Sequence, residues 1–148
     1  MIGLTKEADG ALRIVWLLAK EDKVTGAGSI ARQVAISPQF TLKILRQLLQ
    51  GGVVRAVRGK CGGYALAVAP SDLTVRHVVE LIDGPIAINR CQADDFFCSR
   101  MGYDKQACRF HCLFAAISDR LAHDLESVTL EMMLSDDRCP SEFLTSKK

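Results

Sequence analysis

The stretch that decides the fold is SPQFTLKILRQLLQGGVVRAVRGKCGGYALAV, residues 37–68. It opens with a strong helix start, because the Ser37 hydroxyl is suited to cap the first turn and Pro38 suits the first helical position. The glycine pair at 51–52 is typical of a helix end. The first part of this stretch therefore predicts a helix that ends at Gln50.

The second part of the stretch predicts a β-hairpin. Residues 53–58 and 64–68 are two short runs rich in valine and other apolar residues, as in strands. Residues 59–63 between them read GKCGG, a glycine-rich sequence typical of a hairpin tip.

Two further helices are expected before this stretch. Apolar residues recur at helical spacing over about 6–20, with Thr5 as the expected N-cap, and a short helix is expected at about 29–34. A tight turn at 35–37 then leads into the helix described above. Helix, helix, turn, helix and hairpin together make a winged helix-turn-helix. We therefore expect a mostly α-helical protein with a small β-hairpin wing.

Beyond Pro70 the chain is expected to form a second part with a different role. We divide it into a winged helix-turn-helix domain at 1–70 and a part at 71–148 that contains a cysteine-bearing loop and a long dimerisation helix. The expected elements of this second part are a helix at 75–83, a loop at 86–106, the long helix at 107–126 and a short helix at 129–134.

The charge of the chain is divided unevenly between the two parts. Residues 1–70 carry ten Lys and Arg against four Asp and Glu, whereas residues 71–148 carry nine against thirteen. A basic N-terminal half suits a polyanion such as DNA, although ordinary solvated surface charge remains the alternative. No long uncharged apolar run and no signal peptide are visible. We therefore expect a cytoplasmic protein with no membrane partner.

The helix at 37–50 has the two faces that a recognition helix needs, although a solvated amphipathic helix is the alternative. Leu42, Leu45, Leu48 and Leu49 are expected to pack on the scaffold. Residues near the start of such a helix usually contact bases, and basic residues of a wing reach phosphates or a minor groove. The residues expected to contact DNA are Ser37, Gln39, Phe40, Thr41, Lys43 and Arg46 on the helix, and Arg58 and Lys60 at the wing.

The six cysteines are clustered, since four of them fall within residues 91–112. Structural disulfides are disfavoured in the cytoplasm, so this grouping favours metal or cluster ligation. Thiolates suit iron–sulfur clusters and zinc alike. The gaps after Cys91 and Cys98 are wide, whereas structural zinc sites favour close pairs, so a cluster is preferred and zinc is the alternative. Cys61 and Cys139 have no neighbouring thiol and are expected to be bystanders.

The helix at 107–126 presents two opposite faces. At about 100° per residue, the apolar residues fall within about 60° of Phe110, and the residues able to bind a metal fall on the other side. The apolar face is Phe110, Leu113, Phe114, Ile117, Leu121 and Leu125, and the opposite face holds Cys108, His111 and Cys112. The apolar face predicts a dimer contact; packing on the first helix, or elsewhere within one chain, is the alternative.

Taken together, these residues resemble the Rrf2 family of winged-helix regulators, in particular its iron–sulfur sensors of the IscR, NsrR and RirA types. The likeness covers about residues 4–134, and VRGKCGGY at 57–64 is its most specific signature. LKIL at 42–45 resembles the recognition helix of the family. The resemblance implies a homodimer, a palindromic double-stranded DNA operator, and an iron–sulfur cluster on Cys91, Cys98 and Cys108.

The fourth ligand and the cluster type stay open at this stage. His111 is the first choice, since it follows Cys108 by three residues and lies where IscR-type members carry a histidine ligand. Asp9 of the partner subunit is second, and Cys112 is third. The gap between Cys98 and Cys108 is longer than in those types, and Cys112 is an extra thiol, so a 2Fe-2S and a 4Fe-4S cluster are both considered.

The expected function is therefore transcription regulation by a cluster that senses iron, redox or nitric oxide status. The alternative is a zinc-stabilised or cluster-free winged-helix regulator that responds to thiol oxidation or a small ligand. An enzyme is not expected, because the sequence has no phosphate-binding loop, nucleophile–base pair or paired carboxylates in a recognisable setting.

Overall fold

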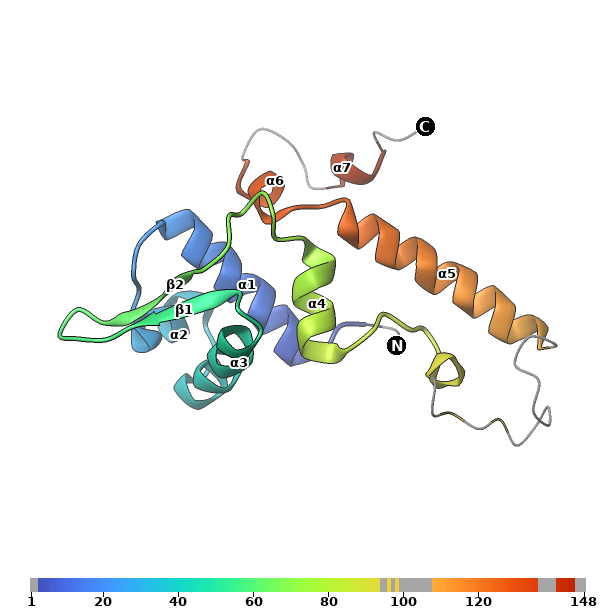
Figure 1. Ribbon diagram of the computed structural model, residues 1–148, viewed down its shortest axis with the longest axis horizontal. Coiled ribbons are helices and arrows are strands. Elements are labelled where there is room, and N and C mark those ends of the chain that lie inside the picture. Colours follow the sequence, from blue (N-terminus) through green and yellow to red (C-terminus); the bar gives the residue numbers. More distant parts are fainter. Residues whose placement is uncertain (1–2, 94–95, 97, 99–107, 136–140, 146–148) are drawn as a thin grey trace.

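The computed structural model describes residues 3–93, 96, 98, 108–135 and 141–145 (Figure 1). Its N-terminal half is a three-helix unit, and its first and third helices begin at a side-chain cap. The Thr5 side chain accepts a hydrogen bond from the Ala8 N–H, and the Ser37 side chain accepts one from the Phe40 N–H. The helices are α1 (Lys6–Glu21), α2 (Ala27–Val34) and α3 (Pro38–Gln50).

The wing is a two-stranded antiparallel sheet made of β1 (Val54–Val57) and β2 (Gly63–Leu66), paired so that Val54 lies opposite Leu66. Thr25, between α1 and α2, adds a bridge to this sheet, because it exchanges two backbone hydrogen bonds of 2.9 Å with Tyr64. Gly63 permits this contact, since a Cβ there would lie 2.4 Å from the Thr25 carbonyl oxygen. The glycine-rich wing is thereby attached to the helical unit.

The core lies around α1 and extends beyond the N-terminal half. Ile14 and Leu18 of α1 pack with Ile44 and Leu48 of α3, all of them fully or almost fully buried. Three residues from the second half of the chain belong to the same core: Leu73, Val78 and Leu130. The division at residue 70 stays a prediction, and the described core spans both sides of it.

The C-terminal half places a long helix beside this core. The helix α4 (Val75–Asp83) packs on α1, and α5 (Arg109–Glu126) packs on α4 and projects away from the wing, so that its N-terminal end is far from the core (Figure 1). The remaining elements are the 3-10 turn η1 (Arg90–Gln92), α6 (Leu130–Leu134) and α7 (Glu142–Thr145).

Most predicted elements are confirmed, with several corrections. The region 86–106, predicted as a loop, contains η1, which a single Asn89 cap starts. Leu42 and Leu49 are exposed, because the buried stripe of α3 is Thr41, Ile44, Leu45 and Leu48, at the 3–4–7 spacing of one helix face. Cys139 lies outside the described residues. Among the described helices, none is long and apolar enough to cross a membrane.

Candidate DNA-binding surface and cysteine site

The N-terminal end of α3 presents a polar surface, with one exception among the predicted contacts. Ser37, Gln39, Lys43 and Arg46 are exposed. Thr41 has no exposed surface, and its hydroxyl donates to the Ser37 carbonyl oxygen at 3.0 Å. We therefore remove Thr41 from the set of residues expected to contact DNA. Its physical role is to complete the buried stripe of α3.

Two of the remaining residues of α3 have partners within the chain. Phe40 is half-buried and packs against the core. The Lys43 ammonium forms an ion pair with the Glu7 carboxylate of α1, although the lysine side chain stays largely exposed. This contact links α3 to α1 at the surface, and a phosphate that approached Lys43 would compete with Glu7 for the charge.

The wing adds a second basic site. Arg58 and Lys60 are exposed on the turn between β1 and β2, and Cys61 beside them is an exposed free thiol. The structure thus places basic residues both on α3 and at the tip of the wing, as the sequence predicted.

The cysteines lie on separate elements. Cys91 is in η1, and Cys108 is the N-cap of α5, with an extended backbone conformation, rather than a residue of the helix itself. Cys91, Cys98 and Cys108 are all half-buried, and Cys112 is exposed. The predicted helical face of ligands is therefore corrected at Cys108, because α5 begins one residue later.

The proposed ligands differ in whether they already have partners. Nδ1 of His111 is buried and has no hydrogen-bond partner among the residues that the structure describes, which is costly for a ring nitrogen unless a ligand satisfies it. The Asp9 carboxylate, in contrast, accepts a hydrogen bond of 2.9 Å from Arg13 on the same helix. This hydrogen bond, with the attraction between the two charges, raises the pKa of Arg13. Among these two candidates, the observation favours His111.

These donors fit an iron–sulfur or zinc group by their chemistry: thiols in half-buried positions and an unsatisfied imidazole nitrogen. Within the part of the chain that the structure describes, no three His, Cys, Asp or Glu side chains lie close enough to hold a metal ion. A bound cluster therefore requires an arrangement of the cysteine segment that differs from the one described.

A further feature of this site was missed from the sequence. Ser118 of α5 is almost completely buried and binds the segment that carries Cys91, through hydrogen bonds to Ile88 and Gln92. The sequence held no clear signal for it, because at about 100° per residue Ser118 falls about 80° from Phe110, at the border of the apolar stripe, where a serine can be buried or exposed.

A helix-turn-helix unit with an antiparallel wing and basic residues on both defines the class of protein, a winged-helix DNA-binding regulator. The sequence pattern of the Rrf2 family, described as iron-dependent transcriptional regulators, matches residues 4–136. The chain belongs to the Rrf2 family. This family consists of transcriptional regulators rather than enzymes, so the chain is a transcriptional regulator.

Individual relatives agree with this assignment. The chain is 36% identical over 108 residues to an rrf2-like HTH-type transcriptional regulator of Rhodobacter capsulatus, covering 72% of this chain and 71% of that one. It is 30% identical over 107 residues to the regulator IscR of Photorhabdus laumondii, covering 72% of this chain and 62% of the relative, less than two thirds of its length.

Solved structures show the same fold. The global cysteine regulator CymR of B. subtilis superposes with a TM-score of 0.72 and 25% identity, covering 93% of this chain and all of that one. IscR of T. potens superposes with a TM-score of 0.70 and 21% identity, covering 92% of this chain and 88% of the other.

Proposed function

We propose that this chain forms a homodimer that binds a palindromic DNA operator, and that an iron–sulfur cluster on Cys91, Cys98 and Cys108 controls its affinity. His111 supplies the fourth ligand. The observation that carries this proposal is the buried Nδ1 of His111, which no described residue satisfies, at the end of the chain segment that holds the three cysteines. The name IscR for several relatives supports it.

The dimer is inferred from the outer face of α5. Phe110 is 69% exposed and Ile117 is 42% exposed, and Leu113 and Leu121 on the same face are also exposed. The rings of Phe110 and Phe114 stack with their centroids 6.4 Å apart. Packing within one chain accounts for only part of this face, because Leu121 and Leu125 line a pocket with α4, whereas Phe110, Leu113 and Ile117 stay exposed. A second copy of α5 is the occupant that suits this exposed apolar face, because in a two-fold dimer each copy covers the same face of the other.

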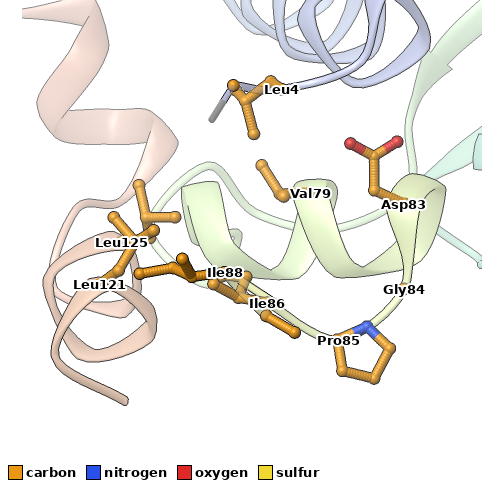
Figure 2. A pocket seen from close by; sticks show the side chains of 11 residues that line it. Leu4, Val79, Asp83, Gly84, Pro85, Ile86, Ile88, Leu121 and Leu125 are labelled. Carbon is orange, nitrogen blue, oxygen red and sulfur yellow. The ribbon is translucent and has the colours of Figure 1, made fainter. Parts of the chain in front are cut away.

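A pocket continues this face toward the body of the protein. Apolar side chains of α4, α5, the N-terminus and the segment 84–88 line a cavity of about 330 Å³ (Figure 2). Leu121 belongs both to the pocket and to the exposed face of α5, while Ile86 and Ile88 come from the segment that leads to Cys91. The proposed dimer face therefore borders the segment that carries the first cysteine.

Within this proposal each part of the chain has a defined role. The thiols and His111 hold the cluster, whose loss or oxidation supplies the signal. The face of α5 holds two copies together, and α3 and the wing of each copy bind one half of the operator. A change in the arrangement of residues 84–93 beside α5 would alter the spacing of the two DNA-binding units.

The first test is the spectrum of the wild-type protein purified without oxygen, together with its iron and sulfide content. We expect a coloured protein with visible absorption that bleaches in air and with iron and acid-labile sulfide in equal amounts. A colourless protein with stoichiometric zinc would establish the zinc-stabilised alternative instead. A colourless, metal-free protein whose operator affinity changes when its thiols are oxidised would establish a thiol-based regulator, and the exposed Cys61 would be the first thiol to examine.

The second test addresses the DNA-binding surface. Arg58→Ala removes an exposed charge at each wing of the dimer, and we expect operator affinity to fall about tenfold at low salt, with a shallower salt dependence, because one phosphate contact is lost in each half of the operator. Lys43→Ala is expected to weaken binding less, since Lys43 must first leave Glu7. The measurement is fluorescence anisotropy with labelled operator at several salt concentrations.

The matched control for both variants is Lys20→Ala. It removes the same charge from the last turn of α1, at the opposite end of that helix from Glu7. If the Arg58→Ala, Lys43→Ala and Lys20→Ala proteins all bind like the wild type, the reading surface has been assigned to the wrong part of the molecule.

A further inference from the structure

The hydroxyl of Ser118 connects α5 to the segment that precedes Cys91. Ser118 is only 3% exposed, and its Oγ lies 3.0 Å from the Ile88 backbone nitrogen and 2.9 Å from Oε1 of Gln92. The backbone N–H of Ile88 is able only to donate, so the serine oxygen accepts that bond. The serine proton is therefore available for the bond to Gln92.

The side chain of Gln92 extends the connection to the turn itself. Its Oε1 lies 3.2 Å from the backbone nitrogen of Asn89, which also donates, so this atom must be the carbonyl oxygen rather than the amide nitrogen. The Asn89 side chain in turn accepts a hydrogen bond of 3.4 Å from the N–H of Cys91. The hydrogen bonds thus run from a buried residue of α5 to the backbone of the cysteine.

This turn is too short to be stable by itself. The element η1 has three residues, none of them buried, so its position depends on the contacts of its ends. Ser118 and Gln92 form the contact that fixes it to α5, beside the face that we assign to the dimer. Ile88, which donates to Ser118, also lines the apolar pocket of Figure 2.

We propose that Ser118 and Gln92 are positioning residues that hold the turn carrying Cys91 against α5 and so join the position of the first cluster cysteine to the dimerisation helix. The proposal deepens the proposed function and rests on it for the cluster. The hydrogen bonds of Ser118 and Gln92, however, form in the chain without a cluster. They require an oxygen acceptor at position 92 and a hydroxyl at position 118.

The test measures the reactivity of Cys91 in metal-free, reduced, full-length protein. Iodoacetamide labelling is followed by peptide mass spectrometry, with the exposed Cys61 of the wing as the internal reference. Ser118→Ala and Gln92→Leu are expected to raise the alkylation rate of Cys91 about fivefold to tenfold, since the turn opens more often once a buried hydrogen bond is lost. The rate at Cys61 is expected to stay unchanged in both.

Two control variants separate positioning from general destabilisation. Gln92→Glu keeps an oxygen that accepts from both Ser118 and Asn89, so Cys91 is expected to react at the wild-type rate. Ser127→Ala removes the hydroxyl that donates to the Asp124 carbonyl oxygen at the other end of α5, and it is also expected to leave Cys91 unchanged. Because Gln92 is only half-buried, its variants are expected to fold, and they test the proposal even if Ser118→Ala does not fold.

The outcomes are distinct from those of the cluster test. Equal Cys91 rates in wild type, Ser118→Ala and Gln92→Leu would overturn the proposal, as would a Gln92→Glu rate as fast as that of Gln92→Leu. If the wild type holds a cluster, the visible absorption of the cluster is expected to bleach faster in Ser118→Ala and Gln92→Leu than in the wild type. Equal bleaching rates would overturn the inference that these residues position a cluster ligand. A wild type without a cluster contradicts the proposed function, while the thiol rates still decide whether the turn is held as we infer.

Discussion

Replacing Ile117 by aspartate is expected to convert the dimer to monomers and to lower operator affinity by about a hundredfold to ten-thousandfold. Ile117 lies in the middle of the exposed apolar face of α5, and a charge there would be buried without a partner in a dimer. A monomer binds one half of the operator at a time, so it loses the gain that comes from linking two binding units. Sedimentation equilibrium and anisotropy with labelled operator measure the two effects.

The matched control for this prediction is Ala116→Asp. Ala116 is exposed on α5 but lies outside the apolar face, at about 100° from Ile117, so the same charge on the same helix should leave the dimer intact. Leu121→Asp is a less specific test, because Leu121 also lines the apolar pocket. A folded Ile117→Asp protein that remains dimeric and binds the operator like the wild type would show that α5 is not the dimer contact.

The helices and the wing were predictable because their signals are local. The Ser37 cap, the proline after it and the glycine pair that follows α3 fix that helix from a few neighbouring residues, and the structure agrees within one residue. The errors within α3 came from treating every leucine as buried. At about 100° per residue, Leu42 and Leu49 lie together on one side of the buried stripe, and the small polar Thr41 belongs to the stripe instead.

The sequence predicted which residue types could bind a metal group at the cysteine site, but it did not predict how those residues are arranged in space. Cys91 is the middle residue of η1 and Cys108 caps the start of α5, and their relative position depends on contacts between segments far apart in the chain. The bond between Ser118 and Gln92 is an example, since 26 residues separate its partners. Sequence periodicity carries no information on such contacts, and a bound group would add further constraints that the chain alone does not contain.

The cluster ligands give the second prediction with a large effect. Single substitution of Cys91, Cys98 or Cys108 by alanine is expected to abolish the cluster, because two thiolates and one weaker ligand do not hold an iron–sulfur group firmly. His111→Ala is expected to retain a cluster with altered absorption and electron paramagnetic resonance spectra, since solvent or a neighbouring donor would replace the imidazole as the fourth ligand. Each protein is reconstituted without oxygen and its iron and sulfide are counted.

Asp9→Ala and Cys112→Ala are the matched comparisons that assign the fourth position. Asp9 is engaged by Arg13, so its loss should break an exposed ion pair and leave the spectrum of the cluster as in the wild type. Cys112 is exposed on α5, whereas Nδ1 of His111 is buried, so removal of the thiol is also expected to leave the spectrum unchanged. A wild-type spectrum for His111→Ala together with an altered one for Asp9→Ala would transfer the role to the partner subunit's Asp9, and an altered spectrum for Cys112→Ala alone would transfer it to that thiol. The buried nitrogen of His111 would then be a structural cost that no ligand offsets.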